Sequence, residues 1–190
     1  MAKNLSPALF LDRDGIINED AGYVYKVSDF IFKNEIFEIV KKANNNNYLV
    51  VIVTNQSGIG RGIYTLRQYQ ELTKWMLERF TEQKCKVDLV LESTFDPESK
   101  DLSGFESFRR KPNPGMILEA AEKLNIDLEN SFLIGDQERD VKAGYAAGIR
   151  KLFLLGKETE LPDVISFTSL SELSLRDDFL VFWGDGESVD

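Results

Sequence analysis

The residues of this chain that could do chemistry are carboxylates placed directly after strand-like apolar segments. Asp12 and Asp14 follow the run 8–11 with one residue between them, and Asp136 follows the run 131–135. Three carboxylates that converge on one point repel each other unless a cation lies among them. Hard oxygen ligands without histidine or cysteine suit Mg²⁺. The spacing therefore predicts a magnesium site.

A hydroxyl, an ammonium group and a further carboxylate accompany these acids. Thr54 ends the apolar run 49–53, Lys111 lies in a basic segment before a predicted helix, and Asp140 closely follows Asp136. Hydroxyl and ammonium groups around a magnesium ion are suited to hold the oxygens of a phosphoryl group. Each residue alone is more often part of a turn, a cap or a solvated surface. Together and in this order they indicate metal-assisted phosphoryl transfer.

The composition excludes several other kinds of protein. The chain has no histidine, which excludes Ser-His-Asp triads and histidine-ligated zinc, and its single cysteine, Cys85, allows no internal disulfide. The net charge of −9 argues against a nucleic-acid partner. No apolar run approaches the ~18 residues of a membrane-spanning helix, and Met1–Ser6 is too short for a signal peptide. We expect no membrane partner and a cytoplasmic location.

The order of the apolar segments predicts an α/β fold. Strands are expected over 8–11, 49–53, 87–91, 131–135 and 151–155, with 164–167 as a further candidate. Helices are expected over 32–43, 65–82, 114–124 and 139–147, and a long loop over 96–110. Strands that alternate with helices predict a parallel sheet with helices on both faces, a three-layer Rossmann-like arrangement. Such a sheet binds its ligand beyond the carboxyl ends of its strands, which is where the acids fall.

The domain organisation is predicted to be simple. The length of 190 residues suits one domain, which we place over 1–175. The acidic C-terminal tail, 176–190, also contains an apolar stretch that we expect to pack on the domain or on a partner.

These motifs resemble those of the haloacid dehalogenase (HAD) superfamily, whose phosphatases use an aspartate nucleophile. The resemblance extends from about Phe10 to Gly156. The strings Thr-Asn-Gln-Ser-Gly at 54–58 and Arg-Lys-Pro-x-Pro-Gly-Met at 110–116 are typical of its bisphosphate phosphatases, which have no cap domain. The resemblance implies the HAD fold without a cap, Mg²⁺ as cofactor, and a small phosphorylated sugar as substrate.

The resemblance also implies roles for the reacting residues. Asp12 attacks phosphorus and forms an aspartyl-phosphate, and Asp14 acts as general acid and then as general base. Mg²⁺ lies between Asp12, the backbone carbonyl of Asp14 and Asp136. Thr54 and Lys111 hold the phosphoryl oxygens.

Further residues are expected around this centre. Arg110 reaches a second phosphate or another part of the substrate, and Asp140 orients Lys111 or the metal shell. The substrate side is formed by residues from two segments: Asp20, Gly22, Tyr23, Asn55, Gln56 and Ser57.

Two positions depart from the pattern of the family. Ile16 stands where the first motif usually has threonine, whose hydroxyl helps to hold Asp14, so a lower rate is expected. Many relatives carry a Cys/His zinc site in the loop before Arg110, whereas the matching stretch here, 92–109, has neither residue type. We therefore expect no structural zinc.

The implied substrate is a heptose 1,7-bisphosphate cut at its 7-phosphate, for lipopolysaccharide or capsule precursors, and the enzyme is expected to be a monomer. Histidinol phosphate is an alternative substrate. A different class, the receiver domains of two-component signalling, shares the parallel sheet and acidic pocket. Receivers pair adjacent acids after the first strand and phosphorylate an aspartate after the third, where this chain has Glu92 after Leu91. A weakly active phosphate-binding module is the third alternative.

Overall fold

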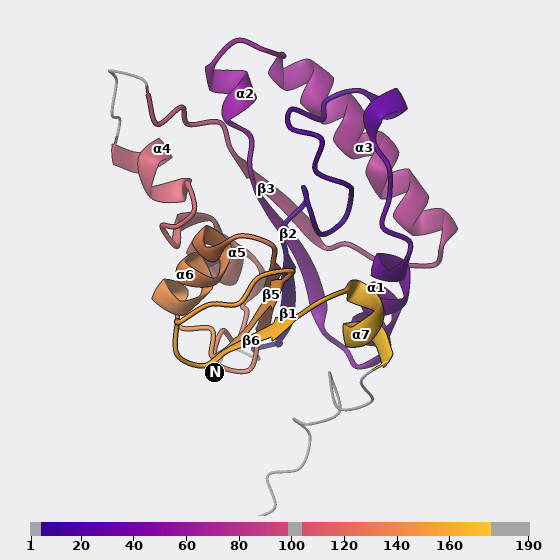
Figure 1. Cartoon of the computed structure of the whole chain (residues 1–190), viewed down its shortest axis with the longest axis vertical. Helices are drawn as coiled ribbons and strands as arrows, with labels where there is room; N and C mark the ends of the chain where they lie inside the picture. The colour runs from indigo at the N-terminus through magenta and orange to yellow at the C-terminus, as the bar shows by residue number, and fades with distance from the viewer. Residues whose placement is uncertain (1–4, 99–103, 176–190) are drawn as a thin grey trace, which may run out of the picture.

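Six parallel strands form the centre of the computed structural model, which describes residues 5–98 and 104–175 (Figure 1). The strands are β1 (Ala8–Leu11), β2 (Leu49–Asn55), β3 (Leu89–Ser93), β4 (Phe132–Gly135), β5 (Lys151–Leu155) and β6 (Val164–Phe167). Their order across the sheet is β3-β2-β1-β4-β5-β6, and every neighbouring pair is parallel. The predicted fold class is confirmed, and the candidate strand at 164–167 is the sixth strand.

Helices cover both faces of this sheet. They are η1 (Val27–Asp29, a 3₁₀ turn), α1 (Glu35–Asn45), α2 (Ser57–Gly60), α3 (Leu66–Glu82), α4 (Gly104–Arg109), α5 (Gly115–Leu124), α6 (Glu138–Ala147) and α7 (Leu170–Leu175). Figure 1 shows α1, α3 and α7 on one side of the sheet, and α5 and α6 on the other. The result is the three-layer arrangement expected from alternating strands and helices.

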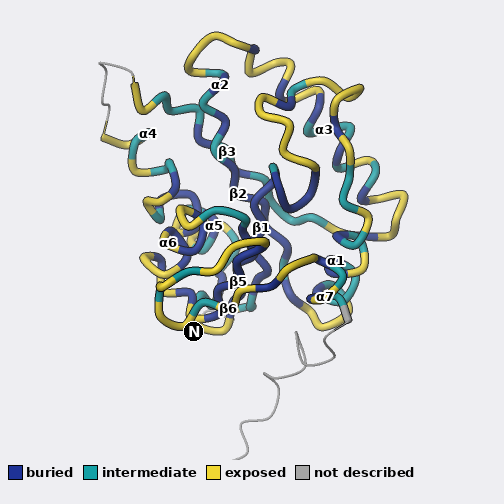
Figure 2. The backbone as a smooth tube through the Cα atoms, viewed as in Figure 1, coloured by how far each residue is buried: buried dark blue, intermediate teal, exposed yellow. Residues whose placement is uncertain are grey.

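Two apolar cores lie between these layers because successive strand residues point to opposite faces. Leu9 and Leu11 of β1 pack in the core beneath α1, α3 and α7. Ala8 and Phe10 pack in the core beneath α5 and α6. The central strands are therefore buried along their whole length, whereas the outer surfaces of helices and loops are exposed (Figure 2).

A local signal sets the start of the longest helix, α3, as predicted. The Thr65 hydroxyl accepts a hydrogen bond from the Gln68 backbone N–H at 3.2 Å, and the Gln68 side chain accepts from the Thr65 N–H at 2.8 Å. This reciprocal pair satisfies two backbone donors that a helix start leaves free. It fixes the first turn of α3 directly after the loop that follows β2.

Several predicted boundaries were displaced. The third strand occupies 89–93 rather than 87–91, and the helix predicted from residue 32 begins at Glu35. Lys33 N–H instead donates to Ile17 O at 2.9 Å. The segment before α1 thus pairs with the loop after β1, a tertiary contact that periodicity does not reveal.

The prediction of a loop over 96–110 was wrong in its last part, because 104–109 forms the helix α4. The side chain of Arg109 at its end forms an ion pair with Glu119 of α5, with Nε–Oε2 at 2.9 Å. This contact helps to hold α4 against α5, so the helix depends on a neighbour rather than on its own sequence. The short α2, η1 and α7 were also not predicted.

All strands of the described residues, 5–98 and 104–175, belong to one sheet. Within these ranges, no connection between strands forms a cap domain. The predicted acidic tail, 176–190, lies outside the described residues. Among the helices of the described part, none is both long enough and apolar enough to span a membrane.

Candidate active site

The three central strands bring the predicted site residues to one edge of the sheet. Asp12 follows β1, Asp136 follows β4, and Thr54 lies near the end of β2. Because β1 lies between β2 and β4, the three carboxyl ends are adjacent. The chain connections diverge at this point of the sheet, where parallel α/β folds bind their ligands.

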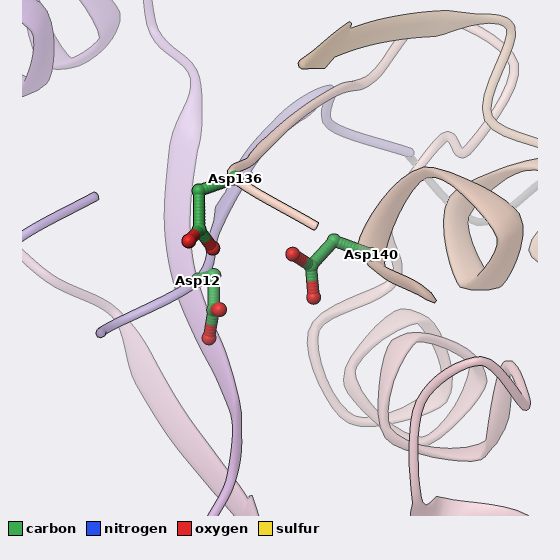
Figure 3. A group of neighbouring side chains, drawn as sticks. All are labelled: Asp12, Asp136 and Asp140. Atoms are coloured by element: carbon green, nitrogen blue, oxygen red, sulfur yellow. The ribbon is translucent and has the colours of Figure 1, made fainter. Parts of the chain in front are cut away.

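Three carboxylates gather at this edge. Asp12, Asp136 and Asp140 each offer an oxygen within 4.8 Å of the other two, and their side chains converge on one space (Figure 3). Asp12 and Asp140 are buried, and the buried Oδ1 of Asp136 has no hydrogen-bond partner. Burial raises the pKa of Asp12 to about 7; Lys111 opposes that shift, and Asp140 and Asp14 reinforce it. So much clustered negative charge fits a divalent cation bound by oxygen ligands.

Lys111 joins two of these acids. Its Nζ lies 2.9 Å from Asp12 Oδ1 and 2.7 Å from Asp140 Oδ1, and it donates to Val53 O at 2.8 Å. Burial alone would lower the pKa of Lys111, but the two carboxylates outweigh it and the pKa is raised. The lysine is therefore a buried, charged group beside the position of the expected nucleophile.

Asn55 fixes the backbone of that lysine. Its Nδ2 donates to Lys111 O at 3.0 Å, and its Oδ1 accepts from Lys111 N–H at 3.1 Å. Both polar atoms of the Asn55 side chain are thus engaged by protein. These hydrogen bonds join Asn55 to the Lys111 backbone, and the expected contact of Asn55 with substrate stays a prediction.

Asp14 is held by three side chains. Arg13 Nη2 lies 2.8 Å from both of its carboxylate oxygens, Asn18 Nδ2 donates to Oδ1 at 3.0 Å, and Gln56 Nε2 donates to Oδ2 at 2.9 Å. Ile16 is buried in the apolar core and takes no part. Donors from other positions therefore hold the acid without a hydroxyl at residue 16.

Gln56 and Thr54 lie beside Asp14 in the interior. Gln56 is 2% exposed, and its Nε2 also donates to Thr54 Oγ1 at 2.8 Å. Tyr64 O–H donates to Gln56 Oε1 at 2.5 Å. The amide of Gln56 is thus hydrogen-bonded to protein groups, and its expected contact with substrate stays a prediction. Ser57 begins the short helix α2 and is half-buried.

Three of the predicted substrate-side residues, Asp20, Gly22 and Tyr23, lie near the surface. Tyr23 is 44% exposed, and the exposed Asp20 accepts from the Gly22 N–H at 3.0 Å. Gly22 has a φ of +93°, which suits glycine at this turn. A cavity of 640 Å³ between this loop and β5 is lined by Asp20 together with Asp136. A cavity of 720 Å³ between α3 and β3 is lined by none of the clustered acids.

Arg110 lies among other positive charges. Its Nη1 donates to Phe95 O at 3.3 Å. Burial lowers the pKa of Arg110, and the charges of Arg139 and Arg61 lower it further. Arg61 in turn forms ion pairs with Asp96 at 3.1 Å and with Glu98 at 3.0 Å.

Sequence reasoning did not assign a role at the site to five of these residues, Arg13, Asn18, Arg61, Tyr64 and Arg139. Arg13, between the two acids of the first motif, carried a usable signal because it closely follows a buried strand, where a charged residue needs a partner. Asn18 and Arg61 belong to the motifs that carry the family resemblance, whereas Tyr64 and Arg139 carried no comparable local signal.

Proteins of known sequence match this chain over most of its length. It is 44% identical over 149 residues to the D-glycero-alpha-D-manno-heptose-1,7-bisphosphate 7-phosphatase of Burkholderia mallei, covering 78% of this chain and 79% of that protein. It is 44% identical over 153 residues to the D-glycero-beta-D-manno-heptose-1,7-bisphosphate 7-phosphatase of Helicobacter pylori, covering 80% and 85%. A family model described as HAD-hydrolase-like matches residues 108–171. The chain belongs to the HAD-like hydrolases.

Solved structures place the fold in the same family. A candidate HAD-like phosphatase from Mesorhizobium loti matches with a TM-score of 0.82 and 34% identity, over 93% of this chain and 85% of that one. The D,D-heptose 1,7-bisphosphate phosphatase of B. bronchiseptica, solved with magnesium and phosphate, matches with a TM-score of 0.77 and 24% identity, over 88% and 96%. The second likeness concerns the fold alone.

Membership of the HAD-like hydrolases decides between the classes considered above. The chain is a phosphoric monoester hydrolase, as the resemblance implied, and not a receiver domain. Its cluster of acids is compatible with the Mg²⁺ that HAD phosphatases use.

Proposed function

We propose that this HAD phosphatase hydrolyses the 7-phosphate of D-glycero-D-manno-heptose 1,7-bisphosphate through an aspartyl-phosphate on Asp12. The observation that carries the proposal is that two cationic residues, Arg110 and Lys111, are adjacent in the chain and have different partners. Lys111 is committed to the acids at the reaction centre, whereas the neighbouring Arg110 has a backbone carbonyl as its hydrogen-bond partner. Arg110 is thus available for a second anionic group, and a sugar bisphosphate has one.

The reaction centre supports attack by Asp12. One oxygen of this carboxylate, Oδ1, is held by the Arg13 N–H at 2.7 Å and by Lys111 Nζ at 2.9 Å. In the first step, an oxygen of Asp12 forms a bond to phosphorus while the bond from phosphorus to the sugar oxygen breaks. Lys111 and Thr54 hold equatorial phosphoryl oxygens as negative charge shifts during that step.

Asp14 acts as general acid in the first step and as general base in the second. It gives a proton to the departing sugar oxygen, and it then takes one from the water that attacks the aspartyl-phosphate. Its three side-chain donors fix the carboxylate in position for both transfers.

Mg²⁺ would be held by the carboxylates of Asp12 and Asp136 and by the backbone carbonyl of Asp14. It supplies positive charge where the carboxylate and the phosphate meet. Asp140, which touches Lys111, is placed to keep the lysine oriented.

Kinetic comparison of substrates tests the proposed function. We expect kcat/KM to be highest for heptose 1,7-bisphosphate, assayed as both anomers, and lower for fructose 1,6-bisphosphate and histidinol phosphate. Arg110→Ala is expected to reduce kcat/KM for the bisphosphates about tenfold or more, and that for monophosphates less. Arg67→Ala is the matched control, because Arg67 is exposed on α3 and pairs with Glu71.

Two results would contradict this substrate assignment. One is histidinol phosphate as the best substrate, which would favour the alternative phosphatase. The other is an equal loss for mono- and bisphosphates in Arg110→Ala, since a residue that binds the second phosphate must discriminate between them.

The remaining features are proposed on the same basis. We propose that residues 1–175 form the single domain, and that the enzyme is a cytoplasmic monomer without structural zinc. The ion pairs of Arg61 with Asp96 and Glu98 support the zinc-free arrangement, because they tie the segment after β3 to the end of α2. Elemental analysis of the purified protein, together with its mass in solution, tests these statements.

A further inference from the structure

The Gln56 amide lies at the junction between two reacting side chains. Its Nε2 carries two hydrogens, and two acceptors lie within reach: Asp14 Oδ2 at 2.9 Å and Thr54 Oγ1 at 2.8 Å. One amide group therefore contacts both the proposed proton donor and the proposed phosphate-binding hydroxyl. The direction in which this amide points decides whether either contact is favourable.

Tyr64 sets that direction. Its hydroxyl donates to Gln56 Oε1 at 2.5 Å, so the oxygen of the amide faces Tyr64 and the nitrogen faces Asp14 and Thr54. In the reversed amide, Oε1 would face the Asp14 carboxylate, where two acceptors repel each other. Gln56 is 2% exposed, so water does not readily replace a lost partner.

The donor-to-acceptor direction of the hydrogen bonds from Tyr64 through Gln56 to Thr54 extends to the substrate. Because Thr54 Oγ1 accepts a hydrogen from Gln56, its own hydroxyl hydrogen is free to point elsewhere. A phosphoryl oxygen is an acceptor, so this is the orientation that Thr54 needs to hold phosphate. A reversed Gln56 amide would draw the Thr54 hydrogen toward Oε1 instead.

The surroundings of Tyr64 fix its ring. The ring is 4% exposed and stacks on Tyr25, with centroids 5.0 Å apart and planes 7° apart. A Cβ on Gly58 would lie 2.2 Å from Tyr64 Cε1, so only glycine at this position lets the ring approach. Burial raises the pKa of Tyr64 to about 12, which keeps the hydroxyl protonated as a donor.

We propose that Tyr64 is a positioning residue of the phosphatase reaction, which acts through Gln56 to orient the Asp14 carboxylate and the Thr54 hydroxyl. This inference rests on the roles proposed above for Asp14 and Thr54. Tyr64 itself does not touch substrate. Its contribution is to the reacting step rather than to substrate affinity.

Steady-state kinetics of Tyr64→Phe test the inference. The variant keeps the ring and its stacking and removes only the hydroxyl. We expect kcat to fall about tenfold, with KM changed less than twofold, because the misdirected groups act in the transition state. Tyr145→Phe, which removes the hydroxyl of a tyrosine 64% exposed on α6, is the matched control and is expected to keep wild-type kcat.

A double-mutant cycle distinguishes action through Gln56 from a general loss of packing. In a Gln56→Leu background, Tyr64→Phe is expected to change kcat less than twofold, because the amide that it orients is gone. Independent, multiplying effects of the two substitutions would overturn the inference, as would wild-type kcat in Tyr64→Phe. Thermal unfolding of each variant shows whether it is folded. If Tyr64→Phe does not fold, the Gln56→Leu single variant tests the inference in its place, and its kcat is expected to fall.

Failure of the underlying roles is separable from failure of this inference. Asp14→Asn and Thr54→Val with wild-type kcat would contradict the proposed function. Impaired Asp14→Asn and Thr54→Val variants beside an unimpaired Tyr64→Phe would contradict only the role of Tyr64.

Discussion

Lys111 Nζ lies 2.9 Å from Asp12 Oδ1, and the two side chains are 1% and 4% exposed. The proposed nucleophile and the proposed phosphate-binding ammonium are thus in direct contact. Asp140 shares the same ammonium at 2.7 Å. One cation therefore both compensates the buried acids and forms part of the phosphate site.

Lys111→Met tests both roles of this lysine, as counter-charge to the buried acids and as part of the phosphate site. Because the substitution leaves Asp12 and Asp140 buried without their counter-charge, we expect a loss of about 3–5 kcal/mol in the free energy of unfolding without metal. Turnover should also fall by orders of magnitude. Denaturant unfolding with and without Mg²⁺ measures the first effect, with exposed Lys74→Met as control. Unchanged stability would mean that the ion pair is not a net stabilising contact.

Asp12→Asn and Asp14→Asn should differ in kind. Removing the nucleophile of Asp12 is expected to abolish turnover and any covalent phosphate. Removing the acid and base of Asp14 is expected to let the aspartyl-phosphate form slowly and then persist, because water is no longer activated. Intact-protein mass spectrometry after mixing with substrate checks both. Near-normal turnover by Asp12→Asn would show the mechanism to be wrong.

Asn55→Ala should impair catalysis without removing any proposed reacting group. The substitution deletes two hydrogen bonds to the Lys111 backbone, at 3.0 and 3.1 Å. Because a small misplacement of a reacting group is costly, we expect kcat to fall about 100-fold. The control is Asn46→Ala, an exposed residue after α1. A change confined to KM would instead support the predicted contact of Asn55 with substrate.

Mg²⁺ should stabilise the folded protein through the clustered acids. At about 100 times its Kd, a cation that binds only the folded state adds about 2.7 kcal/mol. We expect a rise in melting temperature with Mg²⁺ for the wild type, and little rise for Asp136→Asn. EDTA is expected to abolish turnover. Equal Mg²⁺ stabilisation of both proteins would place the ion elsewhere.

Ile16→Thr should not improve the enzyme. The sequence led us to expect that isoleucine at this position slows the reaction, but Asp14 is held by Arg13, Asn18 and Gln56. A threonine hydroxyl in this apolar core is expected to lower the free energy of unfolding by about 1–3 kcal/mol, with kcat within about twofold of wild type. Ile31→Thr, at a position 63% exposed, is the control for stability. A large rise in kcat would restore the original expectation.

The fold and the central acids could be predicted because their signals are local. Buried parallel strands are continuous apolar runs, and Asp12 and Asp136 directly follow two of them. In a parallel sheet the carboxyl ends of the strands share one edge. The pairing of β1 with β4, which the structure reveals, makes Asp12 and Asp136 neighbours at that edge.

The surrounding contacts could not be predicted because they depend on side chains that meet only in the folded chain. Nothing in the spacing of Tyr64 and Gln56 indicates a hydroxyl–amide bond, and Asn55 does not reveal that it will bind the backbone of Lys111. α4 was missed for a similar reason, since its ion pair with Glu119 comes from another helix.

The strand order β3-β2-β1-β4-β5-β6 has a consequence for the way this enzyme acquires its activity. The first strand of the chain, β1, lies in the middle of the sheet. Its partner β4 lies more than 100 residues later in the sequence. Parallel pairing across such long stretches of chain is slow to form. Because Asp12 follows β1 and Asp136 follows β4, we expect these acids to meet only when that pairing has formed, and the enzyme to become competent late in folding.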